Sequence, residues 1–266
     1  MNKYCSIRLF ACFLLYLCSL SLFAFEPLPP CNPFVIASGA LSNLTDDPSS
    51  AQLNPVSGEG GITTSVSYPY SMQQLSQVEI ASVVNYQLNS MYASWQTLSN
   101  NDYNRQDIRL GFRLSYLYFR FGLGYKVMID EMEGYGTEND DRLTAGIRFK
   151  HKKTTLDIGS EHAMPFGRDN SFEDGEFNLS LRQDLDPNLA VAAGFNTDSE
   201  QRFNYKVGTI FGLHPNLKAV ASWESRPGRF GLGAIFKLKW FNLAYAVQTH
   251  PDLDWTHSIG ISALFP

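Results

Sequence analysis

Cysteine is nearly absent from this chain once its first residues are set aside. The 266 residues hold four cysteines. Cys5, Cys12 and Cys18 all lie near the N-terminus, so Cys31 stands alone in the rest of the chain. A single thiol can form neither an internal disulfide nor a cysteine-based metal cluster. The sequence therefore predicts no such crosslink and no such metal site.

Long apolar runs and an excess of positive charge are also lacking. After residue 24 no apolar stretch reaches the ~20 residues that a membrane helix needs. Any membrane location would then require a closed β-barrel, because lipid offers the backbone groups of other structures no partners. The net charge is −5, and it becomes −7 if Lys3 and Arg8 are removed with a leader that holds no acidic residue. This balance argues against nucleic acid as a partner.

The first 24 residues have the pattern of a secretory signal peptide. Lys3 and Arg8 precede an apolar run from residue 9 to residue 23, and Ala24 is a plausible last residue of the signal. A lipid attachment at Cys12 would leave too short an apolar segment. A retained anchor would be short for a membrane span. We therefore expect an exported chain that begins near residue 25.

Strict alternation of apolar and polar residues organises the centre of the chain, from Asp107 to Lys150. A period of two is typical of β-strands with one apolar face. The polar face carries glycine, arginine and lysine, which a dry core does not accept without partners. A soluble sandwich would bury the apolar face, whereas a transmembrane barrel would turn it to lipid. The residues predicted to face the bilayer are Leu110, Phe112, Phe119, Phe121, Ile147 and Phe149.

The same pattern predicts fourteen strands. Their approximate spans are 61–68, 78–86, 90–98, 106–116, 117–129, 142–150, 153–163, 175–183, 189–196, 202–212, 217–225, 229–239, 240–249 and 254–265. Short turns alternate with longer loops, which is typical of outer-membrane barrels. Aromatic residues make up 14% of the chain, and many fall near predicted strand ends, as an aromatic girdle requires. The prediction is an all-β protein, a 14-stranded antiparallel transmembrane β-barrel over residues 60–266, in the bacterial outer membrane.

Residues 25–59 differ from the strands that follow, since they are rich in proline, serine and asparagine and do not alternate. A short helix is expected near residues 47–53, with Asp47 as its N-cap and Pro48 at its first position. Fourteen strands enclose more space than wall side chains fill. We therefore predict a short N-terminal plug segment, with Asp46 and Asp47 meeting a basic wall such as Arg113 and Arg120. The alternative is a surface turn or a disordered leader.

Three stretches resemble a known family. The first runs from Gly39 through Asp46, Asp47 and Pro48 to Asn54 and Pro55. It resembles the N-terminal segment of the PorV/PorQ group and of the wider FadL-like outer-membrane proteins, with Leu53 replacing the usual aromatic residue. The stretch from Phe241 to His257 resembles the last hairpin of that group, and the repeated Pro-Asn-Leu turns at 187–189 and 215–217 also fit. The resemblance implies a 14-stranded barrel with its N-terminal segment in the lumen.

The resemblance also implies two different functions. FadL-like members admit hydrophobic small molecules, and PorV-like members act as carriers in type IX secretion. Our first hypothesis is therefore a passive conduit or binding protein for small hydrophobic or amphipathic molecules. The second is a protein-interaction barrel with a secreted-protein partner, or a structural barrel. Outer-membrane lipid is an expected partner in both cases.

The predicted lumen and plug residues are mostly charged. They are Asp46, Asp47, Asn54, Arg109, Arg113, Arg120, Arg142, Arg148, Asp157 and Glu161. The basic wall could attract an anionic headgroup or carboxylate, or it could be neutralised by neighbouring carboxylates, which is the interpretation we favour. A turn at His151–Lys152 would place Glu161 nearly opposite Arg142, a favourable cross-strand pair.

Signals of catalysis are weak. No serine–histidine–acid or paired-acid spacing stands out, so an enzyme is not expected. His250 and His257 bracket one hairpin, but two ligands are too few for a closed metal site. The sequence predicts no metal and no cofactor.

Overall fold

The computed structural model describes residues 30–265, apart from residues 73, 101, 135, 164–174 and 198–201. The predicted signal peptide, residues 1–24, lies outside the described residues. Among the described residues, no helix is long and apolar enough to cross a bilayer.

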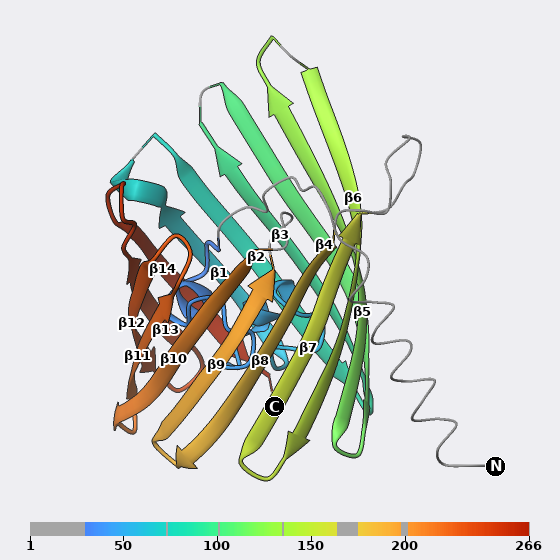
Figure 1. Ribbon diagram of the computed structural model, residues 1–266, viewed down its shortest axis with the longest axis vertical. Helices are drawn as coiled ribbons and strands as arrows, with labels where there is room; N and C mark the ends of the chain where they lie inside the picture. Colours follow the sequence, from blue (N-terminus) through green and yellow to red (C-terminus); the bar gives the residue numbers. More distant parts are fainter. Residues whose placement is uncertain are drawn as a thin grey trace, which may run out of the picture.

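Fourteen antiparallel strands close into one barrel, as predicted. Each strand pairs with its neighbours in sequence, and β1 pairs with β14 to complete the ring (Figure 1). The strands are β1 Gly61–Tyr68, β2 Ser76–Tyr86, β3 Asn89–Ser99, β4 Tyr103–Tyr116, β5 Phe119–Met132, β6 Gly136–His151, β7 Thr154–Ala163, β8 Gly175–Asp186, β9 Leu189–Thr197, β10 Phe203–His214, β11 Leu217–Glu224, β12 Arg229–Lys237, β13 Asn242–Gln248 and β14 Thr256–Leu264. Every predicted strand overlaps the observed strand of the same rank.

Tight hairpins join the strands at one end of the barrel. Leu117 and Lys152 have φ angles of 54° and 52° in the turns after β4 and β6. A left-handed residue is what a two-residue hairpin needs to match the twist of its strands. The predicted hairpin at Lys239–Trp240 with almost no loop is wrong, because β12 ends at Lys237 and residues 238–241 form the turn.

The two faces of the wall differ as the alternation requires. Leu110 and Leu123 are 57% and 60% exposed on the outside, whereas Arg113 between them on the inner face is 1% exposed. Tyr86, Tyr116 and Trp240 lie near the ends of their strands and are exposed. An apolar band bordered by aromatic side chains is the outer surface of a barrel that stands in a bilayer.

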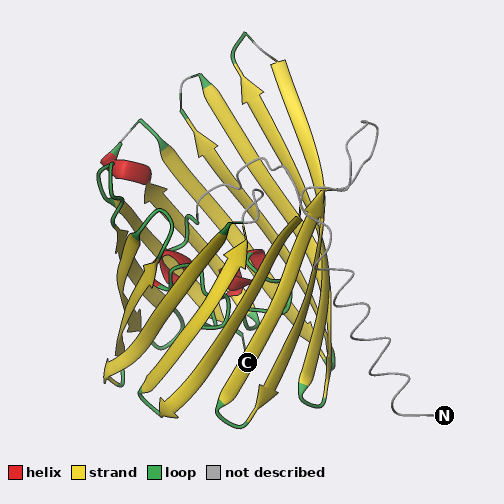
Figure 2. Cartoon of the chain, viewed as in Figure 1, coloured by secondary structure: helices red, strands yellow, loops and turns green. Residues whose placement is uncertain are grey.

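Residues 31–59 lie inside the barrel, where they form short helical turns joined by loops (Figure 2). Helix α2 covers Pro33–Ala37, and Asn32 caps it by accepting a hydrogen bond from the Phe34 amide. The 3-10 helix η1 covers Pro48–Gln52 and begins after Asp47, whose side chain accepts from the Ser49 amide. Both start with proline, which suits the first helical position. A further 3-10 turn, η2 Pro69–Ser71, follows β1.

Candidate functional site

The candidate site is the lumen, together with residues 31–59, which we call the lumen segment. Nearly every residue of the lumen segment is buried, and Asp46 is the one classed as exposed. The segment touches strands around the wall: α2 contacts β12 and β13, η1 contacts β2 and β3, and Asn54 lies against Gly146 of β6. A layer of buried protein therefore spans the lumen at this level.

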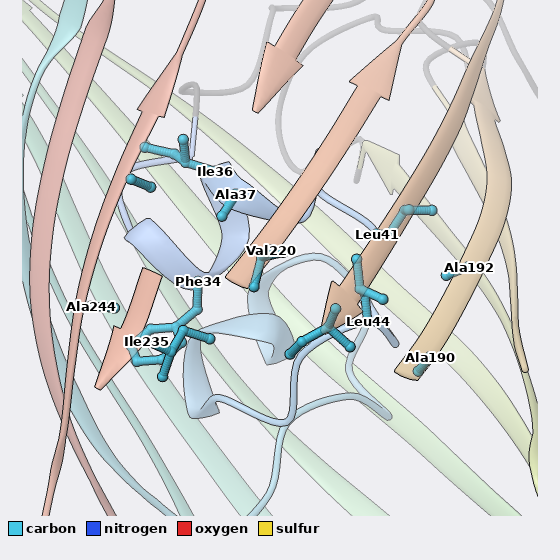
Figure 3. Packing of buried hydrophobic residues seen from close by; sticks show 12 residues of the cluster. Phe34, Ile36, Ala37, Leu41, Leu44, Ala190, Ala192, Val220, Ile235 and Ala244 are labelled. Atoms are coloured by element: carbon cyan, nitrogen blue, oxygen red, sulfur yellow. The ribbon is translucent and has the colours of Figure 1, made fainter. Parts of the chain in front are cut away.

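An apolar half of the segment packs against strands β9–β13. Phe34, Ile36 and Leu44 point at small or branched wall residues such as Ala190 and Ile235 (Figure 3). The whole cluster comprises Phe34, Ile36, Ala37, Leu41, Leu44, Ala190, Ala192, Ile210, Val220, Ile235, Ala244 and Ala246. Each fully buried Leu, Ile or Phe side chain contributes about 1.5–3 kcal/mol of transfer free energy. This half is held by the hydrophobic effect.

A polar half of the segment is held by arginines that donate to its backbone. Arg113 Nη1 lies 2.8 Å from the Gly58 carbonyl oxygen and Arg120 Nη1 lies 3.1 Å from that of Val56. Arg182 Nη1 donates to the Asn43 oxygen at 3.0 Å, and Arg109 donates to the oxygen of Gln52. Buried backbone carbonyls of an irregular segment need such partners. The arginines thus form a collar around the segment.

A buried ion pair on the wall, between Arg148 and Asp157, also holds the segment. Arg148 Nε lies 2.7 Å from Asp157 Oδ1, and its Nη2 lies 2.7 Å from Oδ2. Ser42 and Ser57 of the segment donate their hydroxyls to Asp157 Oδ2 at 3.1 and 2.9 Å. Two-point arginine–carboxylate pairs are the strong form of this interaction. Asp157 therefore connects the wall to two separate points of the lumen segment.

Further charges on the wall neutralise one another. Lys126 Nζ and Arg142 Nη1 lie 3.0 and 3.5 Å from Glu161 Oε1, and Arg142 Nε lies 3.1 Å from Asp140. The Arg142–Glu161 pair is diagonal, because Arg142 lies opposite Ala163 and Glu161 opposite Thr144. This differs from the predicted register. The arrangement favours the neutralised wall over an open anion-attracting surface.

Asp46 meets the basic wall as predicted, but at Arg182; the predicted contacts of Asp46 and Asp47 with Arg113 and Arg120 are wrong. Asp46 Oδ1 lies 3.7 Å from Arg182 Nη1, and Asp47 accepts from the Ser49 amide and hydroxyl. Each of the two arginines donates from Nη1 to a backbone oxygen, and Arg120 also lies 3.6 Å from Glu59. Burial raises the pKa of Asp47 to about 6. Asp47 therefore acts as a helix cap and not as a charge partner of the collar.

Glycines on the inner face make room for the segment. The Asn54 side chain lies directly over Gly146 and Gly159, where an added Cβ would collide with it. Asn54 Nδ2 donates to Asn178 Oδ1 at 3.3 Å, and its Oδ1 accepts from the Val56 amide at 3.2 Å. Asn54 was a candidate site residue, whereas Asn178, Arg182, Ser42 and Ser57 were missed. The glycines of the polar face were the sequence signal that something packs there.

Comparisons with known proteins give structural likeness only. No family model and no curated protein matches the sequence. Among solved structures, two mutants of Rhodopseudomonas blastica porin align with TM-scores of 0.46, at 8% and 7% identity. Each alignment covers 77% of this chain and 98% of the porin chain. A likeness at this level says nothing about what the barrel carries.

Proposed function

We propose that this protein is an outer-membrane barrel closed by its lumen segment, and that it conducts or binds small amphipathic molecules when the segment moves. The apolar outer band supports the membrane location, because such a surface is stable only against lipid. The buried lumen segment supports the closed resting state. The FadL-like resemblance of residues 39–55 agrees with this role.

The proposed substrate class rests on one observation: the inner wall of the barrel has an apolar half and a basic half. The wall behind α2 is apolar, with Ala244, Val220 and Ile235 facing inward. The opposite wall presents the guanidinium groups of Arg113 and Arg120, which in the closed barrel donate to backbone oxygens of the segment. A displaced segment would uncover both walls at once. An apolar chain with an anionic end matches that pair of surfaces.

Cys31 offers a probe of this movement. Its thiol is fully buried and donates to the Gln77 carbonyl oxygen at 3.3 Å, and burial raises its pKa. A seated segment should keep it unreactive toward a maleimide. Laurate, which joins an apolar chain to a carboxylate, should raise the labelling rate of the mature chain in detergent. Dodecanol at the same concentration is the matched control for the carboxylate. Equal rates with and without laurate would contradict the proposed substrate class.

The secretion-carrier alternative is separated by a second experiment. The barrel would be extracted from its native membrane, and the material that accompanies it identified by mass spectrometry. Co-purifying fatty acid or a similar amphiphile supports the conduit. A stoichiometric protein partner, with no amphiphile, supports a PorV-like interaction barrel and contradicts the conduit.

A further inference from the structure

A hollow on the outside of the barrel has no part in the lumen site. It has a volume of about 560 Å³ and lies across strands β8–β11. Most of its lining residues form two rows that follow the strand pairing across the wall, and Ala192, Gly208 and Ser222 of the inner row lie between them. The row nearer the long loops is Leu181, Ala193, Val207 and Trp223, and the row nearer the short turns is Gln183, Val191, Thr209 and Ala221.

These rows face outward and not into the lumen. Leu181, Val207 and Trp223 are 46%, 48% and 37% exposed. The residues that alternate with them point inward, as Gly208 does against Leu44 of the lumen segment. The hollow forms because Ala193 and Ala221 interrupt the larger side chains of their rows. It is therefore a groove on the apolar outer surface.

The size and shape of the groove fit a single hydrocarbon chain. Four neighbouring strands, spaced by about 4.8 Å, make the groove roughly 14 Å long across the wall. A volume of 560 Å³ falls within the range of sites that hold small-molecule ligands. The outward rows are apolar apart from Gln183 at one end and Thr209, whose hydroxyl donates to the Ala190 carbonyl oxygen at 3.1 Å. This leaves an apolar surface for the occupant.

One end of the groove is polar and basic. Gln183 continues its row to Thr154 on β7, and the two side chains are joined by a hydrogen bond of 2.7 Å. Lys152 and Lys153 follow directly in the turn before Thr154, and both are exposed. Lys153 Nζ donates to the Leu185 carbonyl oxygen at 3.2 Å, and an ammonium has further donors to offer. The acid of the neighbouring turn, Asp186, accepts from the Asn188 amide.

We propose that this groove is a binding site for an anionic phospholipid of the leaflet on the short-turn side. One acyl chain lies in the groove between Leu181 and Trp223. Its phosphate pairs with Lys152 and Lys153, and Thr154 and Gln183 lie at the level of the ester groups. The site rests on the membrane location proposed above and is independent of what passes through the lumen.

Native mass spectrometry of the mature chain in detergent tests the site. The barrel is titrated with phosphatidylglycerol and with phosphatidylethanolamine of the same acyl chains. We expect one retained lipid per barrel, with the anionic lipid favoured by about two- to fivefold, the range of an exposed ion pair. Lys152→Gln with Lys153→Gln should remove the preference, and it should weaken the zwitterionic lipid less than the anionic one, because the ethanolamine ammonium already balances its phosphate.

Filling the groove gives the second arm. Ala193→Leu with Ala221→Leu should abolish retention of both lipids, and Ala193→Leu alone serves if the double variant does not fold. Ala145→Leu, on the outer face of β6, is the matched control and should bind as the parent does. Unchanged retention in the filled variants overturns the site. A mass of two protein chains that disappears in the filled variants also overturns the site, because it would assign the groove to a second copy of this protein. A chain that fails to enter vesicles at all would instead contradict the membrane location.

Discussion

Arg148 and Asp157 lie directly opposite each other on β6 and β7 and share two hydrogen bonds of 2.7 Å. Both side chains are buried. Because Asp157 also accepts from Ser42 and Ser57, this pair is the point at which the wall and the lumen segment are most closely joined. The pair faces the lumen, where a carboxylate without its partner would be costly.

Removing one partner of this pair should be strongly destabilising. Asp157→Ala leaves the Arg148 charge buried and unpaired, and we expect the free energy of unfolding to fall by ~3–5 kcal/mol. Urea unfolding of the barrel from vesicles measures it. The control is Asp184→Ala, because Asp184 pairs with Arg182 at 2.8 Å in a more exposed setting. That change should cost about 0–1 kcal/mol. Equal losses in the two variants would contradict the role of Asp157.

The barrel could be predicted from the sequence because alternation is a local signal that each strand carries by itself. The register between strands was less secure. The sequence placed the β6–β7 turn at His151–Lys152, whereas the turn is Lys152–Lys153 with Lys152 in the left-handed region. That shift puts Asp157 opposite Arg148, and it leaves Glu161 diagonal to Arg142.

The collar could not be predicted for a different reason. Arg113 and Arg120 bind backbone oxygens of Gly58 and Val56, and every residue has such an oxygen. Pairing by charge therefore selected Asp46 and Asp47, whereas the acid of the segment that lies beside Arg120 is Glu59. Asp47 could have been assigned from its own position, since an aspartate before Pro48 is a capping signal.

The apolar half of the lumen segment should control access to Cys31. Ile36→Asp places a charge in the cluster with Ile235 and Val220, which is costly without a partner. We expect the maleimide labelling rate of Cys31 to rise about tenfold or more. Asp46→Asn is the matched change within the segment, because Asp46 is exposed and contacts Arg182 only at 3.7 Å. It should leave the rate unchanged. A rate that Ile36→Asp does not alter would show that this cluster does not seat the segment.

The stability of the lumen segment in its closed position should depend on pH through the ionisation of Asp47. Its folded pKa of about 6 lies above its ordinary value of 3.8, because the carboxyl is buried. The stabilisation that Asp47 gives the seated segment is therefore complete below the unfolded pKa of its carboxyl, and it is lost as the pH rises through about 6.

Single-channel openings of the mature chain should consequently be rarer at about pH 5 than at about pH 7.5. Asp47→Asn keeps the capping oxygen but cannot ionise, and it should flatten this dependence. Openings that are equally frequent at both values in the parent chain would contradict the assignment. A dependence that persists unchanged in Asp47→Asn would assign it to another group.

The free-energy cost of placing a charged side chain on the outer face should increase with its depth in the bilayer. Leu123 lies near the middle of the apolar stretch of β5 and is 60% exposed. Leu123→Arg should cost ~2–4 kcal/mol, the range for an arginine at the bilayer midplane. Tyr116, at the short-turn end of the neighbouring strand β4 and on the same outer face, is 62% exposed, and Tyr116→Arg should cost about 0–1 kcal/mol. Folding into vesicles measures both. Equal costs would place the bilayer elsewhere on the wall.

The central claim is that the lumen segment closes the barrel, and single-channel conductance in a planar bilayer tests it most directly. The mature chain is compared with a variant that lacks residues 31–56, and the folding of each is checked by its barrel circular dichroism. We predict that the deletion gives a large and steady conductance, whereas the mature chain stays closed with rare openings. A deletion variant that folds normally and conducts no more than the mature chain would contradict the claim.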